Sequence, residues 1–230
     1  LIGVVVAHML ERRRRAELRD WARSRGLRFS PAKDRSLEGR FPGVERLRKG
    51  SERYAFNVAT GEVDNPHGGR CRVWAFDYHY VTYSSSGRGG RRKNHHRFSA
   101  VILETPYIFK PLSIRPENFL DKVGAFFGAD DIDFESASFS KSFCVKSPDK
   151  RWAYDVISQE TMEFLMRSER FAIEMENLRV SVHQGGRFSP ERFDEAIAVA
   201  RGIVERLPAY TVRELEDRSA RGRGARLVSA

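Results

Sequence analysis

The sequence is short of cysteine, and its two cysteines lie far apart. Cys71 and Cys144 belong to no Cys-x-x-Cys pair and to no Cys/His cluster, so they form neither a structural zinc motif nor the disulfide framework of a small secreted domain. Both fall among apolar neighbours in predicted strands, which favours packing in the core over a role as nucleophiles. We therefore predict two reduced thiols, as is typical of a cytosolic protein.

Recognisable catalytic and cofactor motifs are also missing. The glycine-rich segment 84–97 has no Gly-x-x-x-x-Gly-Lys-Ser/Thr and precedes a strand, so it is not a nucleotide-binding Walker loop. Asp77 and His79 lie on one face of a predicted strand and could begin a metal or acid/base site, but no third ligand has suitable spacing. A hydrogen bond from Asp77 across the sheet is the simpler interpretation. A calcium loop is not indicated either, because its glycine and terminal glutamate do not accompany the acidic residues Asp130, Asp131, Asp133 and Glu135.

No cofactor is therefore predicted, and we expect a protein that is not an enzyme. A catalytic site assembled from residues dispersed along the chain stays an open alternative, since no short motif would mark it.

Basic residues outnumber acidic ones. The chain has 41 Lys and Arg against 31 Asp and Glu, a net charge of +10 and a pI near 9.9. Such a balance favours anionic partners, either nucleic acid or acidic lipid headgroups. The excess lies in the first fifty residues, in the segment 84–97 and in the C-terminal tail, while the middle of the chain is near neutral.

The N-terminal segment is apolar and then abruptly basic. Residues 1–10 are almost wholly apolar, but as a helix they would rise only about 15 Å, too little to cross a bilayer. The next residue is Glu11, and an arginine cluster follows, which is how a transmembrane helix ends on its cytoplasmic side. We therefore interpret residues 1–26 as the end of a transmembrane and juxtamembrane helix. The alternative is a short helix whose apolar end packs on the domain. The cluster expected beside anionic lipid headgroups is Arg12, Arg13, Arg14 and Arg15.

A second basic cluster lies in the segment 84–97, which contains no acidic residue. Its glycines and cations are typical of a flexible finger that contacts phosphate groups, and equally of a solvated hairpin tip. His95 and His96 lie in the same segment. The residues predicted to contact phosphate are Arg88, Arg91, Arg92 and Lys93.

Aromatic and β-branched segments predict an antiparallel sheet. The clearest is 70–104, in which the strands 73–83 and 98–103 flank the basic loop and form a β-hairpin. A strand at 52–63 precedes it, and Pro106 and Pro111 then break the pattern. Further strands are predicted at 112–114, 139–146, 171–176 and 178–183, the last two forming either a hairpin around Asn177 or one long bent strand.

Apolar residues at helical spacing predict the helices. Helices are expected at 11–25, ending at Gly26, at 118–127, and after Ser147 and Ser158. The clearest has Ser189 as its N-cap, Pro190 in its first position and an apolar stripe that runs to Leu207. The Arg-rich tail 216–230 is predicted to be flexible.

Several short stretches together resemble a known family. They are Asn57-Val58-x-x-Gly61, Val73-x-x-Phe76-Asp77-Tyr78-x-Tyr80, Ile114-x-Pro116-Glu117, Ile132-Asp133-Phe134-Glu135-Ser136, Phe143-x-Val145 and Ala153-Tyr154. In this order the series resembles a family of uncharacterised bacterial proteins, classed as a domain of unknown function, with N-terminal membrane spans followed by a soluble domain. The resemblance implies a membrane-anchored domain that faces the cytoplasm, and it brings no catalytic residues with it.

The patterns predict one α+β domain over 27–215, an antiparallel sheet of about six to seven strands packed by helices that include the amphipathic C-terminal one. This strand count before a terminal helix also suggests a pleckstrin-homology-like barrel, although the helices predicted between strands argue against a compact version. The leading functional hypothesis is a membrane-anchored scaffold or binding module, with anionic lipid headgroups and another protein as partners. The alternative is nucleic-acid binding by the 84–97 loop and the tail, for which stacking aromatics are needed and Tyr83 and Phe98 are the nearby candidates.

Overall fold

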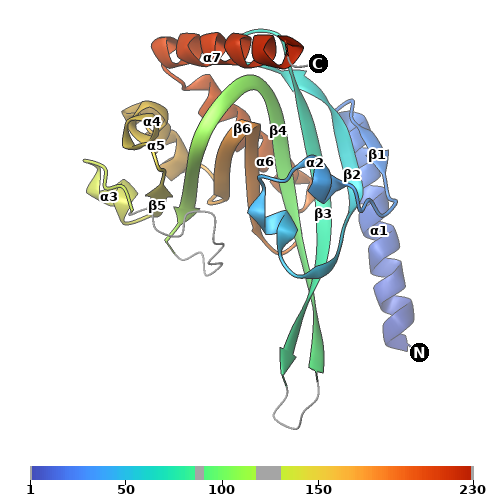
Figure 1. Cartoon of the computed structure of the whole chain (residues 1–230). Helices are drawn as coiled ribbons and strands as arrows, with labels where there is room; N and C mark the ends of the chain where they lie inside the picture. Colours follow the sequence, from blue (N-terminus) through green and yellow to red (C-terminus); the bar gives the residue numbers. More distant parts are fainter. Residues whose placement is uncertain (1, 86–90, 118–130, 229–230) are drawn as a thin grey trace.

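The computed structural model describes residues 2–85, 91–117 and 131–228, and it is an α+β unit in which a six-stranded antiparallel sheet is packed by helices (Figure 1). This confirms the predicted fold class. The strands are β1 (Arg28–Ser30), β2 (Ser51–Asp64), β3 (Arg70–Ser85), β4 (Arg91–Pro116), β5 (Phe143–Lys146) and β6 (Ala172–Gly185). The helices are α1 (Ile2–Ser24), α2 (Leu37–Arg40), the 3₁₀ helix η1 (Glu45–Arg48), α3 (Ala137–Ser140), α4 (Lys150–Val156), α5 (Gln159–Arg167), α6 (Pro190–Glu205) and α7 (Ala209–Val228).

The strands pair in the order β1-β2-β3-β4-β5, and β6 also pairs with β4. The first half of β4 lies between β3 and β6, and its second half lies between β6 and β5. This order is an open path, whereas a pleckstrin-homology-like barrel is closed by pairing between its edges. The hairpin predicted over 70–104 is confirmed as β3 and β4.

Strand β4 bends sharply instead of ending at its prolines (Figure 1). The prediction of a separate strand at 112–114 was therefore wrong. Pro106 and Pro111 are tolerated because the pairing of β4 with β6 shifts register between Glu104 and Phe109, and again before Leu112. β6 follows the same bend, so the predicted alternatives for 171–183 resolve to one long bent strand, with Asn177 at φ 52°.

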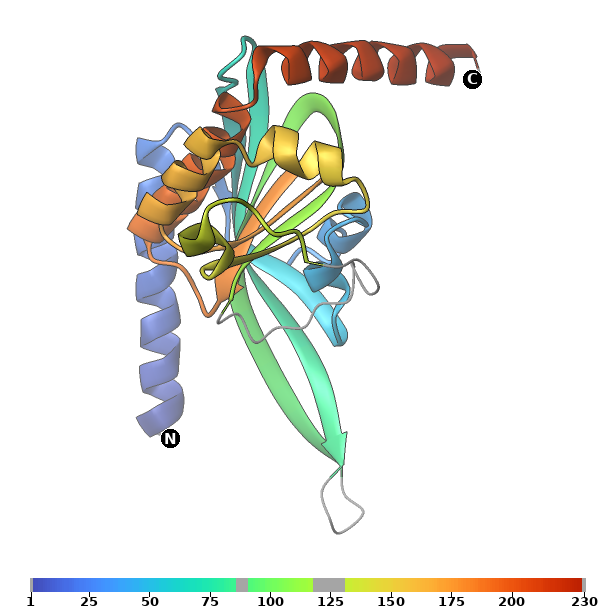
Figure 2. The same ribbon diagram turned by 90° about the vertical axis from the view of Figure 1, so that its left-hand side faces the viewer.

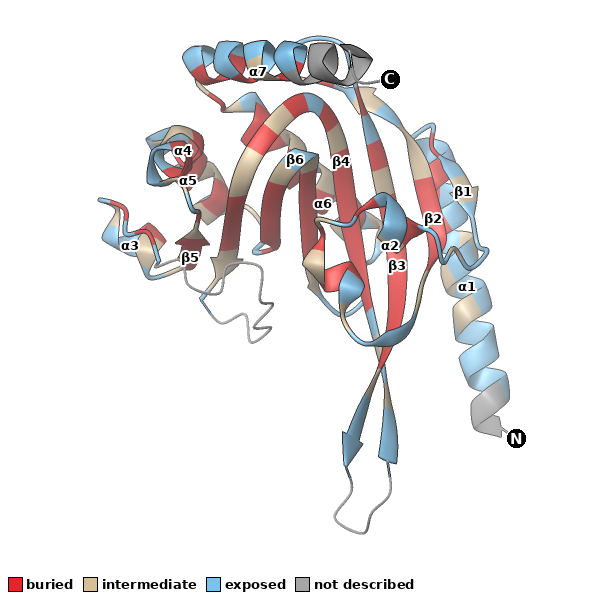
Figure 3. Cartoon of the chain, viewed as in Figure 1, coloured by how far each residue is buried: buried red, intermediate tan, exposed pale blue. Residues whose placement is uncertain are grey.

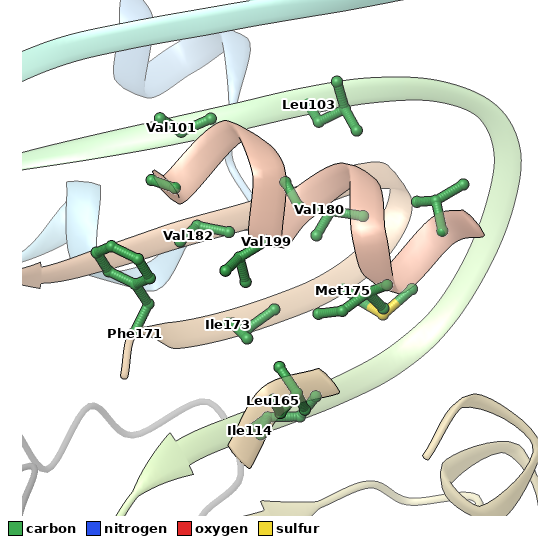
Figure 4. Packing of buried hydrophobic residues seen from close by; sticks show 14 of the residues in the cluster. Val101, Leu103, Ile114, Leu165, Phe171, Ile173, Met175, Val180, Val182 and Val199 are labelled. Carbon is green, nitrogen blue, oxygen red and sulfur yellow. The ribbon is translucent and has the colours of Figure 1, made fainter. Parts of the chain in front are cut away.

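Alternating side chains of the sheet build two cores, one on each face. Figure 4 shows the larger core, where Val101 of β4 and Val182 of β6 point towards Val199 of α6. The smaller core lies on the opposite face, where α2 and η1 cover Phe76, Tyr78 and other residues of β3 and β4. Burial on both faces explains why the predicted strands have so many apolar and aromatic residues.

The helix termini follow the sequence signals closely. Gly26 lies at φ 67° just beyond the last turn of α1, as its predicted role as a helix stop requires. Ser158 and Ser189 each accept a hydrogen bond from the backbone three residues ahead, as the predicted N-caps of α5 and α6. At α4 the N-cap is Asp149, whose carboxylate accepts from Trp152 N, so the predicted Ser147 cap was wrong by two residues.

Three other predictions differ from the structure or lie outside it. The chain beyond Leu215 was expected to be flexible. Its backbone continues α7 as far as Val228, and Val212 and Leu215 are buried in the first turns of this helix. The strand expected at 139–146 is shortened to β5, since the helix α3 occupies its first residues. The helix expected at 118–127 falls outside the described residues.

None of the helices in the described residues combines the length and the apolar content that a membrane span requires.

Candidate functional site

Helix α1 is held against the sheet by charged side chains. Arg14 donates two hydrogen bonds to the Asp77 carboxylate, from Nη2 to Oδ1 at 2.6 Å and from Nε to Oδ2 at 2.9 Å. One turn earlier, Glu11 accepts from Arg97 of β4 at 3.2 Å and from Arg187 at 2.6 Å. The direction of α1 relative to the sheet is therefore fixed by contacts on two successive turns.

The Asp77 carboxylate is completely buried, and its partners come from three elements. Besides Arg14, Asn57 Nδ2 of β2 donates to Oδ2 at 2.9 Å and Ser99 Oγ of β4 donates to Oδ1 at 2.6 Å. Ser99 Oγ in turn accepts from Phe188 N at 2.9 Å. A buried carboxylate needs such partners because its desolvation is costly. The interpretation of Asp77 as a hydrogen-bonding residue across the sheet is confirmed.

The four consecutive arginines of α1 do not form one patch, because successive residues of a helix point in different directions. Arg14 faces the sheet, and only 15% of its side chain is exposed. Arg13 lies on the outer surface and pairs with Glu17 at 2.8 Å. Arg14 therefore has a structural role, although it was predicted to contact lipid.

Arg12 and Arg15 lie on a different side of the helix and line an open groove together with Phe29 and Pro31. Arg19, one turn further along, lines the same groove. The described part of the chain contains no ion pair of Arg12 or Arg15. Of the predicted cluster, these two guanidinium groups are placed to bind an external anion.

The strands β3 and β4 continue past the rest of the sheet as an exposed ribbon, residues 82–85 and 91–95, which we call the hairpin arm (Figure 3). The predicted loop was too long, because Ser85 pairs with Arg91 and Tyr83 with Lys93. The predicted contacts Arg91, Arg92 and Lys93 therefore lie on β4, while Arg88 falls outside the described residues.

Cross-strand contacts hold the arm together. Glu52, which comes from β2, accepts hydrogen bonds from Lys93 Nζ at 2.7 Å and from the Tyr83 hydroxyl at 3.0 Å. The hydrogen bond from Lys93 lowers the pKa of the Glu52 carboxyl below its ordinary value. The guanidinium of Arg91 lies 5.1 Å from the centre of the Tyr83 ring. Arg91 and Arg92 have no ion pair within the described residues, so they are the least neutralised cations of the arm.

A pair of histidines lies at the base of the arm. His79 Nε2 and His95 Nδ1 are 3.0 Å apart, and the other ring nitrogen of His79 lies 3.3 Å from the carbonyl oxygen of Glu52. Burial lowers the pKa of His79. Across residues 2–85, 91–117 and 131–228, no group of three or more His, Cys, Asp or Glu side chains is placed to hold a metal ion.

The arm and the first turns of α1 lie on the same side of the molecule. Figures 1 and 2, which differ by a quarter turn, both show the N-terminal end of α1 and the arm directed away from the body, with α7 at the opposite end. The first turns of α1 expose apolar side chains on this side, with 64% of Met9 and 60% of Leu10 accessible to solvent. One side of the protein therefore combines an apolar helix end with a cationic ribbon.

A buried ionic cluster on β4 and β6 was not predicted from the sequence. His183 Nε2 lies 3.6 Å from Glu174 Oε1, and Arg115 Nη2 lies 3.3 Å from the same oxygen. Burial lowers the pKa of His183. Burial acts to raise the pKa of Glu174, but His183 and Arg115 outweigh it and the pKa is lowered. Only 16% of the Arg115 side chain, 9% of Glu174 and 1% of His183 is exposed, so the cluster lies within the bent sheet and is not an open surface site. Only the alternation of polar and apolar residues in 173–183 could have indicated it.

The two thiols are placed as predicted. Neither sulfur is in a disulfide, Cys71 is buried and Cys144 is half-buried. Burial raises the pKa of both thiols to about 11, so neither is an activated nucleophile.

No protein-family model and no curated protein sequence matches the chain. Among solved structures, the fold is similar to the crystal structure of the mycobacterial trehalose monomycolate transport factor A, TtfA. The TM-score is 0.58 and the sequence identity 13%, over 84% of this chain and 96% of that one. At this identity the likeness concerns the fold alone.

Proposed function

We propose that the protein is a non-enzymatic scaffold or binding module held at the cytoplasmic face of a membrane by the N-terminal part of α1 and by the hairpin arm. The observation that carries this proposal is the common direction of the two features (Figure 2). A flat surface that contacts the N-terminal end of α1 is thereby brought close to the hairpin arm as well.

The exposed side chains of α1 suit the apolar part of such a contact. Val5, Val6, Met9 and Leu10 are each about half exposed or more, and they precede the first arginine within a single helix. An apolar helix end followed by cations is the arrangement that interfacial and membrane-spanning helices share. Arg12 and Arg15 would then lie at the depth of the lipid phosphates.

The arm supplies the electrostatic part. Arg91, Arg92 and Lys93 project from a ribbon that extends past the body of the domain. Each cation near an anionic surface contributes about 1 kcal/mol to binding. Since Arg14 and Glu11 fix α1 on the sheet, the helix and the arm engage the surface together and need no rearrangement of the domain.

Lipid phosphate fits the arm better than nucleic acid does. Base stacking needs an exposed aromatic ring, but Phe98 is buried. Tyr83 is 47% exposed, but Arg91 lies over its ring. The other ring among the described residues of the arm is that of His95, which contacts His79. TtfA, whose fold is similar, is named as a transport factor, and a binding role for this protein is compatible with that name.

The test is co-sedimentation with vesicles of phosphatidylcholine alone and of phosphatidylcholine with phosphatidylglycerol. We expect binding to the anionic vesicles only, weakened by salt. Replacing Arg91, Arg92 and Lys93 by alanine should remove about 3 kcal/mol, which is on the order of a hundredfold in affinity. The matched control replaces three exposed cations elsewhere on the domain, Lys150, Arg213 and Arg221, and should change binding little.

Two results would contradict the proposal. One is no association with anionic vesicles at low salt, and the other is an equal loss of binding in the control variant. Stronger binding to an oligonucleotide than to anionic vesicles, abolished by the same arm substitutions, would instead assign the arm to nucleic acid.

A further inference from the structure

A second cationic surface lies at the end of the sheet away from the hairpin arm. Residues of β1, β2, β3 and α2 line an open groove of about 630 Å³ there. Its charged and aromatic lining comprises Arg28, Arg40, Glu62, Arg70, Arg72 and Trp74. We call it the arginine groove.

The strand register explains why these side chains meet. Arg28 of β1 pairs with Thr60 of β2, which pairs with Trp74 of β3, so all three point to one face of the sheet. Glu62 pairs with Arg72 two residues further along these strands, and because side chains alternate between the faces, this pair lies on the same face as Thr60 and Trp74. This is the face that α2 and η1 cover over Phe76 and Tyr78. The cover reaches Trp74, which is partly buried, but Arg72 in the row beyond it is exposed.

The groove is positively charged after its internal pairs are considered. Arg70 lies between Glu62 at 3.7 Å and Asp64 at 3.2 Å, so its charge is largely neutralised. Arg28 and Arg72 are exposed, and within the described residues neither makes an ion pair. Two guanidinium groups therefore line the groove without a salt bridge or a side-chain hydrogen bond to any of the described residues.

We propose that the arginine groove binds an acidic segment of a partner protein, through carboxylates that pair with Arg28 and Arg72. Guanidinium groups bind carboxylates in a planar two-point geometry, which suits an extended peptide lying across the strands. Glu62, which also lines the groove, adds an acceptor for a backbone N–H or a polar side chain of the peptide. The proposal does not depend on lipid binding by the arm.

A nucleic acid fits this groove poorly. Trp74, its aromatic residue, has its Nε1 bonded to Glu104 at 2.8 Å. Arg40 lies over the indole at 4.9 Å, and the ring of Phe41 packs against it at 5.7 Å between centroids. These contacts already occupy part of the indole, so a base would have to displace Arg40 to stack on that side of the ring.

A membrane surface is also disfavoured as the occupant. The groove lies near the turn between β2 and β3, whereas the arm lies at the other end of β3. A domain that rests on a membrane through the arm presents the groove to the surrounding solution, where a protein segment can reach it.

The experiment measures fluorescence anisotropy of a labelled short poly-glutamate peptide titrated with the protein at low salt. We expect saturable binding that Arg28→Ala/Arg72→Ala weakens on the order of tenfold or more, because charged hydrogen bonds are lost. The matched control, Arg91→Ala/Arg92→Ala in the arm, should bind the peptide as the unmodified protein does. Both substituted pairs are exposed, so circular dichroism should report an unchanged fold.

Three outcomes would overturn the proposal. They are no peptide binding at low salt, an equal loss in the arm variant, and displacement of the peptide by inorganic phosphate or by an oligonucleotide at lower concentration than by unlabelled peptide. Vesicle binding of Arg28→Ala/Arg72→Ala is measured as well. Because the arm is intact in this variant, we expect it to bind anionic vesicles normally, so the two proposals can fail independently.

Discussion

Arg14 of α1 and Asp77 of β3 form a buried two-point ion pair across 63 residues of sequence. The carboxylate has no solvent exposure, and the guanidinium has little. Helix α1 cannot leave the sheet without exposing this pair, so its N-terminal turns keep one direction. The ion pair thus links the packing of the domain to the surface on which the proposed function depends.

We predict that Arg14→Met lowers the free energy of unfolding by about 3 kcal/mol or more, because it leaves a buried carboxylate without its counter-charge. The double variant Arg14→Met/Asp77→Leu should lose less than the sum of the two single changes, since no buried charge is left. Urea unfolding followed by tryptophan fluorescence measures the stability of all three variants. The control is Arg13→Met, whose exposed pair with Glu17 contributes at most about 1 kcal/mol. Additive losses would show that Arg14 and Asp77 do not act as a pair.

Local sequence patterns predicted the sheet, the β3–β4 hairpin and α6. The alternation of apolar and polar residues, the helix N-caps and the apolar stripes each depend on residues that are close together in the sequence. The role of Arg14 was not predicted, although a signal was present: it lies four residues before Leu18, on the stripe that continues to Trp21 and Ala22. A charged residue on a buried stripe needs a partner, but the position of Asp77 follows only from the fold.

Gly50 lies between η1 and β2, and its replacement tests how closely the chain passes β3 at this point. Gly50 has φ 68°, and a Cβ there would lie 2.3 Å from the carbonyl oxygen of Val81. We predict that Gly50→Ala lowers the free energy of unfolding by about 2 kcal/mol or more, from the left-handed backbone and the clash together. Gly39→Ala is the control, because a Cβ at this helical position meets nothing within 4 Å. It should be neutral or stabilise by about 0.5 kcal/mol. Equal effects of the two changes would contradict the geometry around Gly50.

The buried His183 should make stability depend on pH. Its pKa is lowered by burial, with Glu174, Arg115 and Arg46 around it, so the folded protein holds it neutral while the unfolded chain takes up a proton near 6.5. The contribution of His183 to the free energy of unfolding is therefore fully present above about pH 6.5. It decreases as the pH falls below that value, by at most about 1.4 kcal/mol per pH unit for one such group.

Chemical denaturation at several pH values measures this slope. The range from about pH 7.5 to about pH 5 brackets the ordinary histidine pKa of about 6.5. We expect His183→Gln to reduce the slope, whatever its effect on stability at neutral pH. A smaller slope of the same sign should remain from His79, whose pKa burial also lowers. The exposed His8 provides the control, and His8→Gln should leave the slope unchanged. A slope that His183→Gln does not alter would contradict the buried neutral histidine.

Helix α7 shows why the sequence did not indicate a helix at the C-terminal end. Its composition is rich in Arg and Gly, and over residues 209–221 its buried side chains are few, at Thr211, Val212, Leu215 and Ser219. Their spacing of three and four residues is helical, but so short a stripe does not distinguish a helix from a flexible tail. What orders α7 is its contact with the bend of β4, more than a hundred residues earlier in the chain.

That contact gives the final prediction. Ile108 lies where the pairing of β4 with β6 is interrupted, and its N–H donates to the buried Ser219 Oγ at 2.9 Å, while its carbonyl accepts from Arg218 at 3.2 Å. Ser219→Ala leaves the Ile108 amide without an acceptor, so we expect a loss of about 1–3 kcal/mol in unfolding free energy and faster hydrogen exchange at Ile108. Arg213→Ala, on the exposed side of α7, should change neither quantity. Unchanged exchange at Ile108 in Ser219→Ala would mean that α7 does not protect the bend of β4. The helix would then contribute nothing to the shape of the sheet, which positions the arm and the arginine groove.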